Sequence, residues 1–292
     1  MYSAIAANKR NTLVIMALFI GIITGLGWVG GQLYGNGSWV YWALAFGLAY
    51  ALIQYFIADK LALAVNGAKP IAKSDNPRLY RIVENLSIAS GMPTPKIYVM
   101  NDPAANAFAT GRNPAHASVA ATTGLLDIMD DDELEAVMAH EMGHVKNYDI
   151  RVMMIVFGLV SAIGLLADGL LRIGWFGGGN DNRQVPPIFY IIGIIAILLA
   201  PLAALLVQLA VSRQREYLAD ATGAMTTRYP EALASALSKI AQQGSATRAQ
   251  NGSTAHLFFA NPLKGKMLTG LFSTHPPIEQ RIKRLREMAG KF

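Results

Sequence analysis

Long apolar runs alternate with polar segments along the chain, and this pattern predicts membrane helices interrupted by a folded domain. Four runs are apolar or small almost throughout, and each reaches the roughly 20 residues that a helix needs to cross a membrane. They are residues 12–33, 39–58, 152–171 and 187–211. Four such runs in 292 residues favour membrane spans over buried core helices. The first run is too long for a signal sequence and is followed by no Ala-x-Ala cleavage site, which predicts a retained anchor.

The two polar segments, residues 59–151 and 212–292, have the periodicity of a mainly helical domain with a small sheet. Short strands are expected at residues 96–100, 106–111 and 117–124. Helices are expected from apolar spacing and start signals at residues 78–91, 123–129, 212–225, 230–242 and 276–289. One more helix is expected after the three aspartates at 130–132, since acidic side chains suit the positive end of a helix.

Basic residues predict how the spans are oriented, because cytoplasmic loops of membrane proteins are enriched in Lys and Arg. The link between the last two runs, residues 172–186, holds only Arg172 and Arg183 of the 25 Lys and Arg residues. The N-terminal tail and the two polar segments hold all the others. Both termini and both polar segments are therefore expected on the cytoplasmic face of the membrane.

Composition narrows the function classes. Hydrophobic residues make up 53% of the chain and charged residues 15%, against about 25% charged residues in soluble domains. The chain has no cysteine, which excludes disulfides, thiolate zinc sites and a cysteine nucleophile. The net charge of +6 suits a cytoplasmic surface near anionic lipid. No nucleic-acid partner is expected, because the chain has no dense basic run and no recognised binding motif.

Candidate chemistry is concentrated in AVMAHEMGHVKNYDI, residues 136–150. His140 and His144 are four residues apart, so on a helix both imidazoles point from one face toward a single metal ion. Glu141 lies beside that face, where a zincin has the general base that activates water. The apolar neighbours predict that this helix is buried, and Gly143 is expected to leave room for substrate. Imidazole ligands and an open fourth position favour Zn²⁺, one ion per chain.

A third ligand has to come from elsewhere in the chain. A metzincin would have a histidine at position 150, which is Ile150 here, so that class is excluded. The other zincin solution is a glutamate from a later helix. Glu216 in REYLAD fits it, and Asp220 one turn further on is expected to form a hydrogen bond to a ligand histidine.

An intramembrane protease is an alternative that carries the same histidine motif. Such enzymes take their third ligand from an aspartate in a distant span, and Asp168 could imitate this arrangement. The histidine helix, however, also contains several charged residues near its ends, and it cannot lie in hydrocarbon. Asp168 is instead expected near the outer interface or paired within the helix bundle.

Four motifs, in this order along the chain, resemble those of the HtpX family of bacterial membrane-embedded zinc metalloproteases. They are NAFATG, HEMGHVKNYD, SRQREYLADA and STHPPIEQRI. The resemblance covers nearly the whole chain, and it extends more distantly to the CAAX prenyl endoproteases. It implies zinc bound by His140, His144 and Glu216, with Glu141 as the base.

The resemblance also implies how a substrate is held. The NAFAT strand is expected to be the edge to which a substrate backbone adds as a further strand, with contacts from Asn106, Ala107 and Phe108. His275, in STHPP, corresponds to a histidine that stabilises the tetrahedral intermediate, although a role at the helix entry fits it equally well. Arg281 is expected to tie this last segment to the domain.

The fold class expected is a mainly α integral membrane protein with four transmembrane helices and a cytoplasmic zincin-like (gluzincin) α+β catalytic domain with a small sheet. Residues 1–58 form the tail and the first two spans, and 59–151 form the first half of the catalytic domain. Residues 152–211 form a membrane hairpin, and 212–292 form the second half with the third ligand. His116 and His256 have no motif and are expected at the surface.

The function expected is zinc-dependent cleavage of damaged or misfolded membrane proteins, with a cytoplasmic active site in the bacterial inner (plasma) membrane. The alternatives are a processing protease for one substrate and an inactive metal-binding scaffold. The intact Glu141 argues against a scaffold, since a structural metal site needs no base. A transporter would have polar residues deep in several spans, and these spans have few. The partners expected are polypeptides and the lipid bilayer, and no oligomeric state follows from the sequence.

Overall fold

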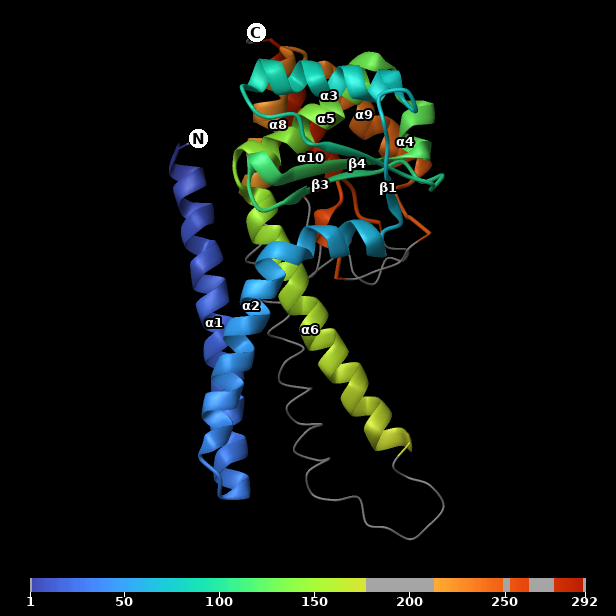
Figure 1. The fold of residues 1–292 in the computed structure, drawn as a ribbon. Coiled ribbons are helices and arrows are strands. Elements are labelled where there is room, and N and C mark those ends of the chain that lie inside the picture. The colour runs from blue at the N-terminus through green and yellow to red at the C-terminus, as the bar shows by residue number, and fades with distance from the viewer. Residues whose placement is uncertain (1, 177–212, 249–252, 263–275, 291–292) are drawn as a thin grey trace.

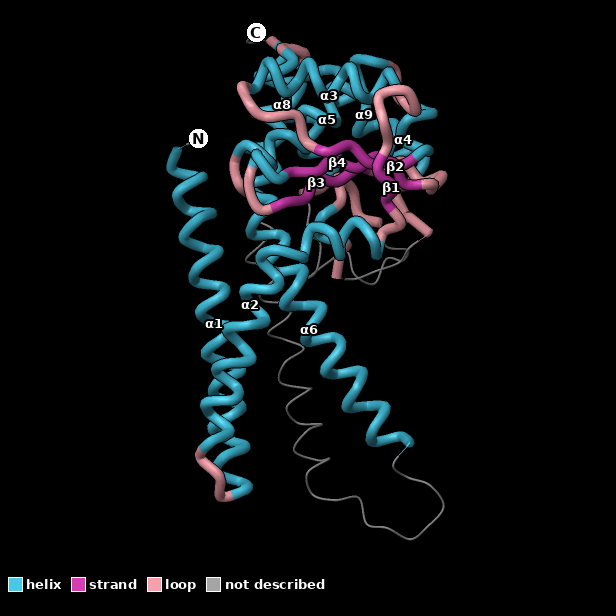
Figure 2. Tube along the Cα trace, viewed as in Figure 1, coloured by secondary structure: helices cyan, strands magenta, loops and turns pink. Residues whose placement is uncertain are grey.

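The structure is a computed structural model that describes residues 2–176, 213–248, 253–262 and 276–290 (Figure 1). A helical hairpin and a third long helix project from one side of a domain in which helices cover a small sheet (Figure 2). The fourth expected span, residues 187–211, and His275 lie outside the described residues.

The hairpin consists of α1 (Tyr2–Tyr34) and α2 (Ser38–Val65). Two stretches, Ala4–Trp28 and Ser38–Val65, are long and apolar enough to cross a membrane. Among the described residues, most of the large exposed apolar side chains lie on these two helices, as expected for a surface in contact with lipid. The third apolar run lies within one continuous helix, α6 (Asp149–Phe176), against which α1 packs.

Four strands form the sheet, in the order β1-β2-β4-β3. The strands β1 (Ala68–Pro70) and β2 (Lys96–Met100) are antiparallel, and β2 runs parallel to β4 (Ala117–Thr122). The strand β3 (Ala107–Gly111) pairs with β4 in the antiparallel direction. Both β3 and β4 are buried along their whole length, and β3 forms one edge of the sheet.

The expected helices of the domain are confirmed, and they lie together over the sheet (Figure 1). They are α3 (Pro77–Ser90), α4 (Thr123–Ile128), α5 (Asp131–Lys146), α8 (Arg213–Thr227), α9 (Pro230–Gln243) and α10 (Ile278–Ala289), with short 3-10 turns η1 (Pro114–His116) and η2 (Ala255–Leu257). The last helix begins two residues later than expected, because Pro277 takes an extended conformation at its N-cap.

The helix α5 begins with a capping box in which the side chains of Asp130 and Glu133 each accept a backbone N–H of the other residue. It crosses α8 at very close range. A Cβ on Gly223 would come within 3.0 Å of the backbone nitrogen of His140, and one on Gly143 within 3.3 Å of the carbonyl oxygen of Ala219. The expectation that Gly143 makes room for substrate is therefore wrong, because this glycine lets α8 approach the histidine helix.

Candidate metal centre

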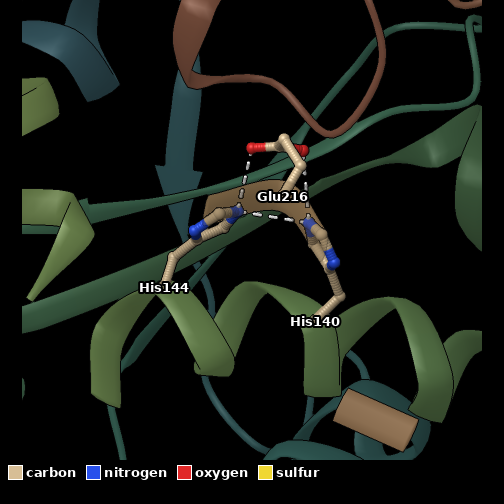
Figure 3. A group of neighbouring side chains, drawn as sticks. All are labelled: His140, His144 and Glu216. Carbon is tan, nitrogen blue, oxygen red and sulfur yellow. Dashed lines mark hydrogen bonds and ion pairs between the residues drawn. The ribbon is translucent and has the colours of Figure 1, made fainter. Parts of the chain in front are cut away.

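The two histidines of α5 converge as their spacing predicts. The Nε2 atoms of His140 and His144 lie 3.2 Å apart, and both side chains are buried (Figure 3). Two imidazole nitrogens at this distance, each with a lone pair on the same side of the helix, form two corners of a coordination site for one metal ion.

The close crossing of α5 and α8 brings Glu216 to the same point. Its carboxylate oxygens lie 3.5 Å from His144 Nε2 and 3.9 Å from His140 Nε2 (Figure 3). Ligand bonds of about 2.0–2.1 Å in a tetrahedral zinc site place the ligand atoms about 3.3 Å apart. The observed spacings are close to that value, so the three residues fit a tetrahedral ion without rearrangement of the backbone.

Each histidine is held from behind by a carboxylate. Asp220 Oδ1 lies 2.9 Å from His140 Nδ1, and Asp149 Oδ2 lies 3.0 Å from His144 Nδ1. Because a carboxylate accepts a hydrogen bond, each Nδ1 carries a proton, and in the neutral form of each imidazole Nε2 is the nitrogen that can bind a metal. The sequence indicated Asp220, but it did not indicate Asp149, which follows the motif in a tight turn.

Arg281 has a larger role than tying the last helix to the domain. Its guanidinium is fully buried and donates hydrogen bonds of 2.9 Å and 2.7 Å to the two oxygens of Asp220. It also lies 3.9 Å from Glu216 and stacks over the ring of Phe259. Arg281 therefore holds Asp220 ionised and oriented toward His140.

The pKa values of the metal-free site separate the two histidines. Burial lowers the pKa of His140 to about 4, which the hydrogen bond to Asp220 only partly offsets. Burial also opposes charge on His144, but the hydrogen bond to Asp149 and the negative charge of Glu216 outweigh it and raise the pKa to about 9. Without metal, His144 is therefore protonated at neutral pH and His140 is not.

Binding of a divalent metal ion to these three residues is expected to release about one proton at pH 7, because a metal binds neutral imidazole and His144 must lose its proton. Protonation of His144 competes with the metal below its pKa of about 9, so the apparent metal affinity should rise as pH increases from 7 toward 9. Calorimetric titration in buffers of different ionisation enthalpy measures the proton. An affinity that is equal at pH 7 and pH 8 would contradict a protonated His144.

Glu141 has the properties of a base rather than of a ligand. Its side chain is 1% exposed, and among the described residues its Oε1 has no hydrogen-bond partner. Burial raises the pKa of Glu141 to about 7. The charges of His144 and Arg281 act to lower this pKa, and the charge of Glu216 acts to raise it. A carboxylate that titrates near neutral pH can both accept a proton and return it.

The edge strand β3 is occupied by the chain's own residues. Phe258 forms a bridge with Phe108, and the backbone N–H of Phe259 donates to the carbonyl oxygen of Ala107 over 2.8 Å. Asn106 is buried, and its amide donates to the carbonyl oxygen of Ala260 and accepts from the N–H of the same residue. The Phe259 ring packs edge-on against His140 and thus covers the metal centre.

The two histidines without motifs differ from each other. His116 is exposed, as expected. The expectation of a surface position is wrong for His256, which is buried with its Nε2 3.2 Å from the carbonyl oxygen of Met153. His256 belongs to the turn η2, which is buried together with the following residues Phe258 and Phe259 that pair with β3. No pattern in the sequence indicates this burial.

Known proteins resemble the chain over its whole length. The family model of Peptidase family M48 matches residues 73–289. The chain is 55% identical over 294 residues to a protease HtpX homolog of Tropheryma whipplei, with 100% of both chains covered. It is 41% identical over 298 residues to a protease HtpX homolog of Streptococcus uberis, with 99% of this chain and 100% of that relative covered.

A solved structure has a similar fold. The crystal structure of S. mikatae Ste24p matches with a TM-score of 0.52 and 20% identity over 98% of this chain and 67% of that one. The metal site, the fold and the apolar helices together define a membrane metalloprotease. The chain belongs to Peptidase family M48, and its resemblance to the HtpX proteases is confirmed.

Proposed function

We propose that this chain is a zinc endopeptidase of the bacterial inner membrane that cleaves damaged or misfolded membrane proteins. One zinc ion per chain binds to His140, His144 and Glu216. The observation that supports this function best is the buried glutamate at position 141, which interacts electrostatically with His144 and Glu216 and whose Oε1 has no hydrogen-bond partner in the described part of the chain. A metal site that only stabilised the fold would not need a general base.

The ligands and their partners divide the chemistry between them. Two imidazoles and one carboxylate are a donor set that zinc prefers, and a zinc ion held by them would supply Lewis acidity toward the scissile carbonyl and toward water. Glu141 takes the proton of the attacking water and passes it to the leaving amine. Asp220 and Asp149 keep the imidazoles in the tautomer that presents Nε2 to the metal.

The proposed orientation places the catalytic domain in the cytoplasm and four helices in the membrane. It is supported by the two apolar helices of the hairpin and by the distribution of Lys and Arg. The projecting helices lie on one side of the domain (Figure 1), so the domain would be held at the membrane surface. A protease held there acts on segments of membrane proteins that emerge into the cytoplasm.

The substrate is proposed to add to the edge of β3, with contacts from Asn106, Ala107 and Phe108, and His275 is proposed to stabilise the tetrahedral intermediate. An edge strand binds a backbone without regard to sequence, which suits a protease of damaged proteins. Phe258 and Phe259 occupy this edge in the structure. The segment that contains them has to leave β3 before a substrate can pair there.

Cleavage of an unfolded polypeptide should depend on zinc. The full chain, purified in detergent with a chelator, is expected to leave casein intact, and addition of zinc should start its cleavage, whereas calcium or magnesium should not. The ligand set explains this preference, since both of the latter ions bind oxygen rather than imidazole. A zinc-loaded protein that cuts one defined membrane protein but no unfolded chain would instead support a processing protease.

A further inference from the structure

The start of the N-terminal helix docks beside the metal centre. Asn8 is only 4% exposed, although it lies near the end of a projecting helix. Its amide Nδ2 donates to the carbonyl oxygen of Asn147 over 2.9 Å and to Asp149 Oδ1 over 2.6 Å. Thr12 is buried one turn on, and its hydroxyl donates to the carbonyl oxygen of Asn8. The contact joins residues separated by about 140 positions in the sequence.

The turn that receives Asn8 connects the histidine helix to α6 and has a rare backbone conformation. Tyr148 has a φ of 61°, which is uncommon for a residue with a side chain. The cations of Lys9 and Arg151 each lie over its ring, at 4.8 Å and 5.0 Å from the ring centre. The N-terminal helix thus contributes both Lys9 and Asn8 to holding this turn.

The carboxylate that Asn8 holds is the one that orients a metal ligand. Asp149 is completely buried, and its two oxygens face in different directions. One accepts from Asn8, and the other lies 3.0 Å from His144 Nδ1. Because the Nε2 of His144 belongs to the candidate metal site, a continuous chain of hydrogen bonds links α1 to that site.

We propose that Asn8 is a positioning residue of the zinc centre, acting through Asp149 on His144; this role rests on the zinc site proposed above. A carboxylate can rotate about its last side-chain bond, and a donor fixed on one oxygen restricts that rotation. Arg215 forms an ion pair with the same oxygen of Asp149 over 3.9 Å, a longer contact than the 2.6 Å hydrogen bond from Asn8. The N-terminal helix is therefore part of the active site as well as an anchor.

Zinc affinity measures this role independently of proteolysis. In the full chain in detergent, Asn8→Ala is expected to weaken zinc binding about 10-fold in competition with a fluorescent chelator, the lower end of the effect of losing a direct partner of a ligand histidine, because Asn8 acts through Asp149. Asn11→Ala removes the same side chain from the next turn of the same helix, where it is only half-buried, and should leave the affinity unchanged. The visible spectrum of the cobalt-substituted protein should shift in Asn8→Ala only.

A paired exchange separates positioning from a general effect on folding. In Asn8→Asp with Asp149→Asn, the amide at 149 can accept from His144 through its oxygen and donate to the carboxylate at 8. This double variant should bind zinc more tightly than Asn8→Asp alone, in which two carboxylates face each other. Equal affinities for wild type and Asn8→Ala, or a double variant no better than Asn8→Asp, would overturn the role of Asn8.

The control His144→Ala distinguishes a failure of the proposed zinc centre from a failure of the proposed role of Asn8. If wild type binds one zinc and His144→Ala does not, the metal centre is correct and the Asn8 comparison decides the positioning role alone. If wild type and His144→Ala bind zinc equally weakly, the metal centre is wrong, and the role of Asn8 is overturned with it.

Discussion

Replacing Glu141 by glutamine is expected to slow peptide cleavage about 10²–10⁴-fold while one zinc ion still binds per chain. The amide has nearly the shape of the carboxylate but cannot take a proton from water. Glu141 is outside the ligand set, so zinc content should not change. Cleavage of casein at saturating zinc, measured together with the zinc content of the same sample, gives both values.

The same substitution should not destabilise the protein. Glu141 is fully buried, and one of its oxygens has no partner among the described residues, so its negative charge costs folding free energy. A neutral amide removes that cost, and the melting temperature of Glu141→Gln should equal or exceed that of wild type. Glu135→Gln, on a half-buried position of the same helix, is the matched control for activity and stability. Cleavage by Glu141→Gln at the wild-type rate would exclude Glu141 as the base.

The sequence predicted the parts of the site that depend on helix periodicity. His140 and His144 converge because residues four apart share a face of a helix, and Asp220 follows Glu216 by the same spacing. The helices of the domain and the strands β2, β3 and β4 were predicted from similarly local patterns, whereas the three-residue strand β1 was not predicted. These features are local, and each can be found within a window of about 18 residues.

The contacts that complete the site depend on irregular backbone and on distance along the chain. Asp149 reaches His144 only because Tyr148 has a positive φ, which no periodicity indicates. In the sequence, Asn8 is one polar residue at the start of an apolar run. Its partner, Asp149, lies 141 positions further along the chain. Gly143 could be interpreted as room for substrate or as room for a helix, and only the position of α8 decides between them.

The prediction with the largest effect on stability concerns Arg281. Arg281→Met is expected to lower the free energy of unfolding by about 3–5 kcal/mol, because it leaves a buried carboxylate without its main partner. Burial opposes the charge of Asp220, but the guanidinium of Arg281 and the hydrogen bond to His140 lower its pKa to about 2. Denaturation of the full chain in detergent measures the loss. Lys283→Met, an equivalent change at an exposed position of the same helix, should have little effect.

A second substitution tests whether the unpaired charge is the cause. Asp220→Asn in the Arg281→Met background removes the carboxylate that was left buried, so the double variant should be more stable than Arg281→Met alone. Zinc affinity should stay low in both variants, because neither keeps a carboxylate oriented toward His140. If Arg281→Met were no less stable than Lys283→Met, the buried ion pair would contribute nothing to the fold. The orientation of His140 would then depend on the packing of α5 against α8 alone.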